Sequence, residues 1–262
     1  MNGVKKCVFC DQPMTGLKSN EHIIPYWLLK YLNIKNDVIS PTHHSIETGE
    51  AVSTRTHVLD KLLAGGVCRN HCNGGWMSDL EVEINDLLIE LIEAKRRVDD
   101  LSHEEKLLLS RWATKTAYTL NLGSNFTKMV PLEHFHSIYK NPTSLPDNVY
   151  VFAQNHKSDS KFYWNQNNMW RFINSQGDIE KDDMRMMKEN GYKIGFQFGS
   201  LLLLVVYVPI QEYALVLNKD VHIIVYPGNK RGRKLGEYDM DFTWDNSKKA
   251  LIEFSFGVQL AI

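Results

Sequence analysis

The chain has 262 residues, of which 43% are hydrophobic and 23% are charged, and its formal net charge is −1. This length and composition allow a hydrophobic core large enough for two ordinary domains, and they exclude a disordered tail, a collagen-like rod and a highly charged solvating segment. Because the net charge is close to zero, any contact with nucleic acid must come from a local patch.

Two cysteine pairs are the first chemical feature of the sequence. Cys7 and Cys10 form C-V-F-C, and Cys68 and Cys72 form C-R-N-H-C. Two turns that each offer two thiolates are the ligand set of a structural, tetrahedral zinc ion. His71 in place of Cys72 would give a Cys3His set, and four reduced core thiols or a redox pair are further alternatives; we favour the four cysteines. No apolar stretch of about 7–15 residues precedes the first pair as a signal peptide would require, so we expect a cytoplasmic protein.

The segment after the first pair, S-N-E-H-I-I-P-Y-W, predicts a short strand that ends at Pro25. Neighbours in a strand point to opposite faces, so Glu21 and His22 can reach one site only near a strand end or a bulge. A long insertion follows, from Tyr26 to about Gly66, and we expect it to contain a short helix at its start, over about residues 26–34.

The second pair leads into C-N-G-G-W-M-S-D-L-E, where we expect a helix to open at Asn73 and to cover residues 76–97. Asparagine is a favoured N-cap, so Asn73 could simply cap this helix. One apolar stripe with helical spacing supports the helix, formed by Leu80, Ile84, Leu87, Leu88, Leu91 and Ile92. Glu81 could be a third metal ligand, but we interpret it as an ordinary carboxylate on the helix face.

The order C-x-x-C, E-H-I-I-P and C-x-x-x-C-N-G-G-W-M-S-D-L-E resembles the HNH endonucleases, and more narrowly the bacterial HNH proteins with a G-W-M-S-x-L-E continuation. The resemblance covers residues 7–82 and implies a ββα-metal hairpin and helix with a structural zinc. It implies that His22 is the general base and that Glu21 and Asn73 hold a catalytic divalent cation. Two oxygen ligands suit Mg²⁺ or Mn²⁺. The implied activity is metal-dependent hydrolysis of phosphodiester bonds in DNA.

The chain departs from the family pattern at the middle asparagine. The residues before the second cysteine pair, Lys61 to Gly66, offer no asparagine, and His57 is the nearest polar substitute. The main alternative is therefore a non-catalytic, zinc-stabilised module that binds nucleic acid or a protein. A third hypothesis is a nuclease that is switched on by an unknown ligand of the C-terminal domain. Activity of residues 1–100 alone, together with inactivity of the full chain, would favour it.

The rest of the chain predicts helices and then strands. Residues 102–105, S-H-E-E, fit a capping box that opens a helix over 102–121. Pro131 opens a third helix that stops before Asn141. From residue 148 onward, short segments rich in β-branched and aromatic residues predict strands of a mostly antiparallel sheet.

The longest apolar run, Leu201 to Ile210, is shorter than the roughly 20 residues of a membrane-spanning helix, so we expect no membrane contact. Within it, Leu201–Val208 best fits a central strand that is buried on both faces. We predict an α+β protein with an N-terminal ββα-metal nuclease domain, residues 1–100. A helical bridge and a mostly antiparallel α+β domain, residues 101–262, would target or regulate it.

A basic tract, G-N-K-R-G-R-K, lies near the C-terminus and carries Lys230, Arg231, Arg233 and Lys234. These cations could neutralise phosphates of a nucleic acid, although a solvated hairpin tip is the simpler interpretation. We expect DNA as the partner and leave RNA open. HNH domains nick one strand per active site, so the resemblance implies a homodimer for a double-strand cutter. By analogy with small bacterial proteins of this type, phage defence or a mobile element would be the setting.

Overall fold

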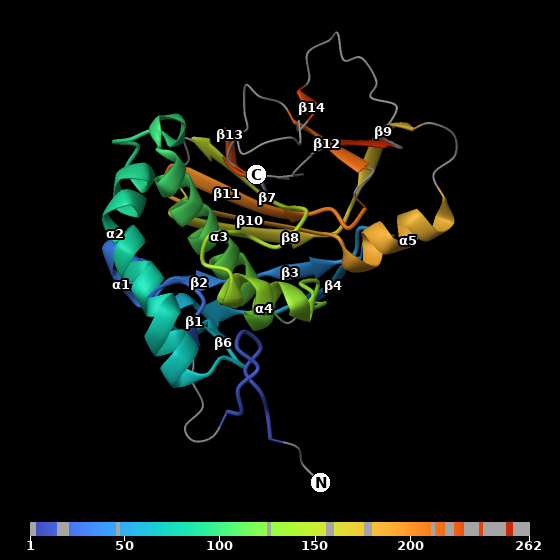
Figure 1. Cartoon of the computed structure of the whole chain (residues 1–262). Helices are drawn as coiled ribbons and strands as arrows, with labels where there is room; N and C mark the ends of the chain where they lie inside the picture. The colour runs from blue at the N-terminus through green and yellow to red at the C-terminus, as the bar shows by residue number, and fades with distance from the viewer. Residues whose placement is uncertain are drawn as a thin grey trace. The chain divides into compact units, whose positions relative to one another are not determined.

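A computed structural model of the chain describes residues 4–14, 21–45, 48–124, 127–155, 160–175, 180–210, 213–217, 223–227, 236–237 and 250–253. The protein is a mixture of helices and mostly antiparallel sheets, as the predicted α+β class requires (Figure 1). It divides into two compact units, residues 1–86 with 114–144 and residues 87–113 with 145–262. The first unit contains residues from both sides of residue 100. The predicted division into a nuclease domain, residues 1–100, and a targeting or regulatory part, residues 101–262, stays a prediction.

The first unit begins with short strands and short helices. Its strands pair antiparallel as β1 with β6, β2 with β5 and β3 with β4. The bounds are β1 (Glu21–His22), α1 (Tyr26–Tyr31), β2 (Val38–Ile39), β3 (Thr42–His44), β4 (Ala51–Thr54), β5 (His57–Val58), a 3-10 helix (Leu59–Lys61) and β6 (Leu63–Ala64). The helix expected at the start of the insertion is confirmed as α1. The paired strands β2 to β5 in that insertion were not predicted.

Three longer helices follow: α2 (Ser78–Ile92), α3 (His103–Gly123) and α4 (Leu132–Lys140). Their positions agree with the predicted helices, and α4 begins directly after Pro131. The prediction that a regular helix opens at Asn73 is wrong. Wide helical turns occupy Arg69–Met77, and Gly75 there lies outside helical geometry, with φ −119° and ψ −121°. Glycine tolerates this conformation, and the α-helix proper starts after it.

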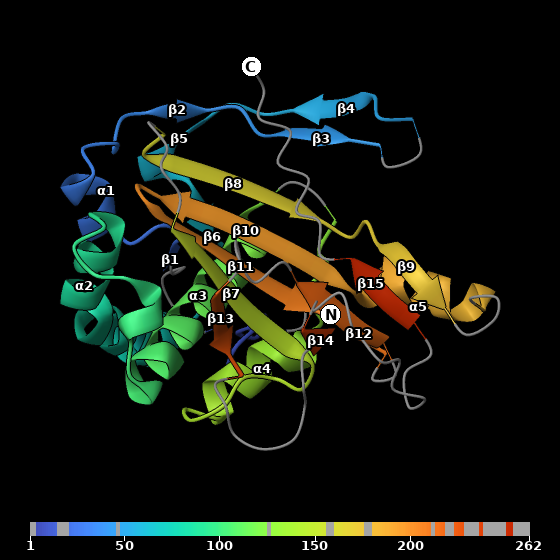
Figure 2. The ribbon, with the colours of Figure 1, turned by 90° about the horizontal axis from the view of Figure 1, so that it is seen from above.

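The second unit is built on a sheet with the order β13-β7-β11-β10-β8, whose strands lie side by side in Figure 2. Their bounds are β7 (Val149–Asn155), β8 (Phe162–Asn167), β10 (Tyr192–Phe198), β11 (Leu201–Tyr207) and β13 (Ile223–Tyr226). The apolar run forms β11, which pairs with β7 and β10 and is buried from Leu201 to Val206. The predicted central strand is therefore confirmed.

A second sheet of this unit has the order β14-β12-β15-β9, in which β12 pairs parallel with β14 and β15. Its strands are β9 (Arg171–Ser175), β12 (Tyr213–Leu217), β14 (Gly236–Glu237) and β15 (Ala250–Glu253). Helix α5 (Lys181–Asn190) lies between β9 and β10 in the chain and was not predicted. None of the helices in the described part of the chain combines the length and the apolar character that a membrane span requires.

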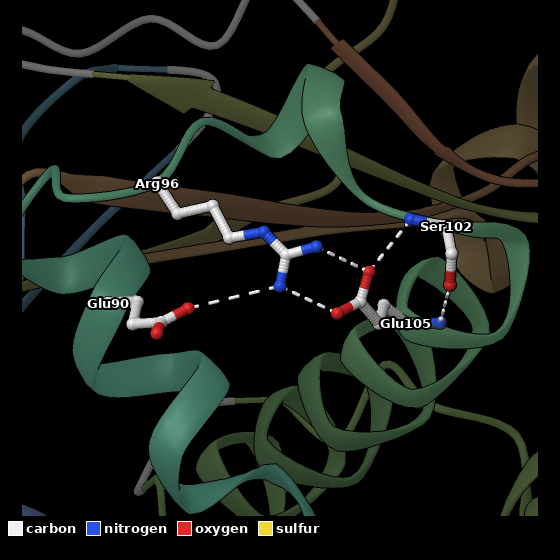
Figure 3. A network of polar contacts seen from close by, with 4 residues as sticks. All are labelled: Glu90, Arg96, Ser102 and Glu105. Carbon is white, nitrogen blue, oxygen red and sulfur yellow. Dashed lines mark hydrogen bonds and ion pairs between the residues drawn. The ribbon is translucent and has the colours of Figure 1, made fainter.

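The start of α3 shows the predicted capping box, drawn in Figure 3. The backbone N–H of Glu105 donates to Ser102 Oγ over 3.2 Å, and the backbone N–H of Ser102 donates to Glu105 Oε2 over 2.8 Å. Arg96 adds two hydrogen bonds to the same carboxylate, at 2.6 and 2.7 Å, and lies 3.8 Å from Glu90. The Arg96 guanidinium lowers the pKa of Glu105 and keeps the carboxylate ionised.

We expect Ser102→Ala to lower the free energy of unfolding of the second unit by about 1 kcal/mol, because the N–H of Glu105 loses its acceptor. Urea unfolding followed by circular dichroism measures the change. His103→Ala at the next, exposed position is the control and should be nearly neutral. Equal effects of the two substitutions would contradict the role of the cap.

Candidate metal centre and active site

The two cysteine pairs meet in the first unit. The Sγ atoms of Cys7, Cys10, Cys68 and Cys72 all lie within 4.8 Å of one another. Cys7 and Cys72 are 3.6 Å apart, and Cys10 and Cys68 are 3.5 Å apart. Thiolates about 2.3 Å from a tetrahedral zinc ion would be about 3.8 Å apart, so this cluster fits zinc. His71 is exposed and lies outside the cluster, which favours Cys72 as the fourth ligand.

Backbone hydrogen bonds hold the two cysteine turns together. The backbone N–H of Cys68 donates to Cys7 Sγ over 3.2 Å, and that of Val8 donates to the carbonyl of Gly66 over 2.9 Å. Phe9, which lies inside the first pair, is fully buried against Trp76 and Phe135 at ring distances of 5.6 and 5.1 Å. Trp76 of the wide helical turns therefore packs against the first cysteine turn.

Without a cation the four thiols cannot all be ionised. The sulfur atoms of Cys7 and Cys72 share a hydrogen bond, and this interaction lowers the pKa of Cys7 to about 4. The same interaction and burial raise the pKa of Cys72, and burial raises the pKa of Cys10 to about 11. Thiolates are the form that binds zinc, so metal binding at this cluster would release protons.

Strand β1 presents Glu21 and His22 to different surroundings. Glu21 is opposite Ala64 in β6 and His22 is opposite Leu63, and the backbone N–H of Ile23 donates to the carbonyl of Leu62. Glu21 is 5% exposed, whereas the His22 side chain is 36% exposed. The expected alternation of neighbours in a strand is therefore present, and no bulge brings the two side chains to one side.

Glu21 belongs to a buried charge cluster that the sequence analysis missed. Lys115 of α3 is fully buried, and its Nζ lies 2.7 Å from Glu21 Oε1 and 2.6 Å from Glu81 Oε1. Helix α3 approaches the segment after β1 closely at its C-terminal end, where a Cβ on Gly123 would overlap the side chain of Ile23. Glu81, interpreted from sequence as an ordinary surface carboxylate, is instead a partner of this lysine.

The electrostatics of this cluster depend on burial. Burial raises the pKa of Glu21, and the charge of Lys115 opposes this effect. Burial also acts to lower the pKa of Lys115, but the carboxylates of Glu81 and Glu21 outweigh it and raise that pKa. Two converging carboxylates match a hard divalent cation in donor type and in charge. In this structure the ammonium group of Lys115 is the positive charge between them.

His22 lies in a polar, half-exposed environment. Its Nε2 is 3.9 Å from Asp60 Oδ1, and its ring centroid is 5.6 Å from that of Tyr26. Asp60 comes from the 3-10 helix before β6 and is also 3.9 Å from both Lys35 and Lys61. The sequence predicted His57 as the polar substitute for the missing middle asparagine, and the side chain that approaches the His22 imidazole is that of Asp60.

The remaining predicted residues lie as follows. Asn73 is half-buried in the wide helical turns, where its backbone N–H donates to the carbonyl of Cys68 over 3.0 Å. His57 lies on β5, opposite Ile39 of β2. The basic tract with Lys230, Arg231, Arg233 and Lys234 lies outside the described residues.

Comparison with known proteins leaves the family open. No protein-family model, no curated protein and no solved structure matches this chain.

Proposed function

We propose that the chain is a metal-dependent endonuclease of the HNH type that hydrolyses phosphodiester bonds in DNA, with His22 as the general base. One observation carries the proposal. The second cysteine turn of the four-cysteine cluster follows β6, the partner of β1, in the chain and leads into α2, and β1 exposes an imidazole 3.9 Å from a carboxylate. The residue order of the motif supplies the rest of the argument, because Glu21 and Asn73 stand at the ligand positions of the family pattern.

In this mechanism the His22 imidazole takes a proton from the attacking water. Its half-exposed position leaves it accessible to water and to a phosphate, and a neutral imidazole is a suitable base near pH 7. The Asp60 carboxylate, 3.9 Å from Nε2, stabilises the imidazolium that forms. A divalent cation, Mg²⁺ or Mn²⁺, held by Glu21 and Asn73 would neutralise charge on the phosphate and on the leaving oxygen. The base and the cation must act on the same phosphodiester, and β1 is only two residues long, so both Glu21 and His22 lie at an end of the strand.

The proposal predicts that the full chain nicks or cuts plasmid DNA when Mg²⁺ or Mn²⁺ is added. His22→Ala should lower the cleavage rate by a factor of about 100 to 10,000, the usual contribution of a general base. His44→Ala, at an exposed position of β3, is the matched control and should leave the rate unchanged. Gel quantification of supercoiled, nicked and linear plasmid gives the rates.

Full cleavage by His22→Ala would contradict the role of this histidine. Absence of cleavage by the wild-type chain in both cations, with DNA and with RNA, would contradict the nuclease proposal as a whole. The zinc content of each variant should be measured alongside, so that loss of the fold is not mistaken for loss of the base.

A second candidate is a non-catalytic, zinc-stabilised module that binds nucleic acid. The observation in its favour is the ion pair of Lys115 with Glu21 and Glu81, since the ammonium already neutralises the carboxylate that a catalytic cation would need. A cation titration separates the candidates. The nuclease requires a second, weaker divalent cation besides zinc, whereas the module requires zinc alone.

A further inference from the structure

We propose that an exposed patch beside His22 binds the phosphate backbone of the nucleic-acid substrate. The patch consists of Tyr26, Lys30, Lys35 and Lys61 and is called the Tyr26–lysine patch below. The proposal rests on the proposed function, because it assigns the substrate contacts of the same site. It is independent of the basic tract near the C-terminus.

The lysines of the patch are held in place by neighbouring groups. Lys35 Nζ donates a hydrogen bond to the Tyr26 hydroxyl over 2.9 Å and lies 5.0 Å from the centre of the Tyr26 ring. Lys30 Nζ lies over the same ring at 4.4 Å, a distance at which an ammonium is attracted to an aromatic face. Lys61 is 3.9 Å from Asp60. A lysine whose position is fixed loses less side-chain entropy when it binds an anion.

The patch has more positive than negative charge. Lys35 and Lys61 each lie 3.9 Å from the Asp60 carboxylate, which His22 also approaches. Lys30 lies over the Tyr26 ring instead, so the patch has three ammonium groups beside this one carboxylate. Tyr26, Lys30 and Lys61 are exposed, and the Lys35 side chain is 38% exposed. The whole chain has a net charge of −1 and so does not attract a polyanion as a whole. A local excess of positive charge, such as that of the Tyr26–lysine patch, can do so.

The position of the patch indicates which anion it binds. The Tyr26 ring is in contact with the His22 ring, with centroids 5.6 Å apart, so the ammonium groups are beside the proposed general base. A nucleic acid that offers one phosphodiester to His22 would bring its neighbouring phosphates to these lysines. Contacts of this kind fix the register of the strand and carry no sequence information, so binding should depend on salt and hardly on sequence.

The test measures DNA binding separately from cleavage. Fluorescence anisotropy with a labelled 20-base-pair duplex, in the absence of added divalent cation, gives Kd for the full chain at several salt concentrations. We expect the variant Lys30→Ala/Lys35→Ala/Lys61→Ala to bind at least about tenfold more weakly in 50 mM salt. The slope of log Kd against log salt should fall by about one for each phosphate contact that is lost.

Two further variants control for total charge and for folding. Lys5→Ala/Lys140→Ala/Lys188→Ala removes three exposed lysines from other parts of the chain and should bind as the wild type does. The variant Lys30→Arg/Lys35→Arg/Lys61→Arg keeps the charges and should retain most of the binding. Circular dichroism and zinc content confirm that each variant is folded.

The outcomes distinguish the two proposals. Binding that depends on the patch in a chain that cleaves no nucleic acid would support the patch and contradict the nuclease. Cleavage by the wild type, together with equal binding by the patch variant and the charge control, would overturn the patch and leave the nuclease standing. A wild-type chain that does not bind the duplex or its single strands would also overturn the patch.

Discussion

Replacing Cys72 by serine is expected to abolish zinc binding and to unfold the first unit. The cysteines are far apart in sequence, and their Sγ atoms come within 4.8 Å only in the folded unit. Structural zinc sites contribute about 10–16 kcal/mol in small zinc-binding domains. This is similar in size to the total stability of about 5–15 kcal/mol of an ordinary protein. The first unit should therefore lose its structure in the variant or after prolonged treatment of the wild type with a strong chelator.

Zinc content by mass spectrometry and the near-ultraviolet circular dichroism of the aromatic residues measure this effect. Trp76 and Phe9 pack beside the cysteine turns, so their environment reports on the fold there. His71→Ala is the matched control, because His71 is exposed and lies next to Cys72 in the chain. It should keep one zinc per chain. If His71→Ala loses the ion and Cys72→Ser keeps it, the Cys3His set is correct instead.

Elements with a strong local signal were predicted well. The capping box of Ser102 and Glu105 set the start of α3, Pro131 set the start of α4, and an uninterrupted apolar run identified β11 as the central strand. Each of these signals is contained in a few neighbouring residues. Its structural effect therefore does not depend on contacts with distant parts of the chain. The cysteine cluster was predicted for a related reason, since spacing alone brings a pair of thiols to one turn.

Elements without an apolar pattern were missed. Helix α5 has the sequence K-D-D-M-R-M-M-K-E-N, in which only Met187 is buried, so neither a stripe nor an alternation marks it. The regular helix after the second cysteine pair begins at Ser78 because Gly75 interrupts the helical turns before it. Asn73 was interpreted as an N-cap because the sequence does not show that wide helical turns precede the regular helix.

The surroundings of Glu21 and His22 were the least predictable part of the candidate site. Asp60 reaches His22 from a 3-10 helix in the long insertion, and Lys115 reaches Glu21 from a helix far along the chain. One signal was available: residues 112–121 of α3 read W-A-T-K-T-A-Y-T-L-N, in which Lys115 is the single charged residue, and a helix face that is open to water normally carries more charges. A lysine in such a helix must have partners. For the same reason a fragment that ends at residue 100 would lack the Lys115 partner of Glu21.

We expect Lys115→Met to destabilise the protein by about 3–5 kcal/mol. The side chain of methionine has a similar length, so the change mainly removes the positive charge and leaves Glu21 and Glu81 facing each other without a counter-ion. Glu21 is nearly inaccessible to water, which could otherwise screen the two carboxylates. Urea unfolding of the full chain measures the loss. Lys106→Met, near the start of the same helix, is the control and should change stability by less than about 0.5 kcal/mol.

The double variant Lys115→Met/Glu21→Gln tests whether the loss comes from the unpaired carboxylate. It should be more stable than Lys115→Met alone, and a double-mutant cycle gives the coupling of the two residues. A cost of Lys115→Met below about 1 kcal/mol would show that the buried ion pair does not form.

The same single variant separates the two functional candidates. If Glu21 and Glu81 can hold a divalent cation, Mg²⁺ or Mn²⁺ should restore the stability of Lys115→Met, by about 2.7 kcal/mol when the cation is at 100 times its Kd. The control Lys106→Met should gain little from the cation. Restoration would mean that Glu21 can exchange the ammonium for a metal ion, which is what the nuclease requires of this residue. No restoration at millimolar concentrations would mean that Lys115 is a permanent structural counter-ion, and the zinc-stabilised binding module would then be the better account of Glu21.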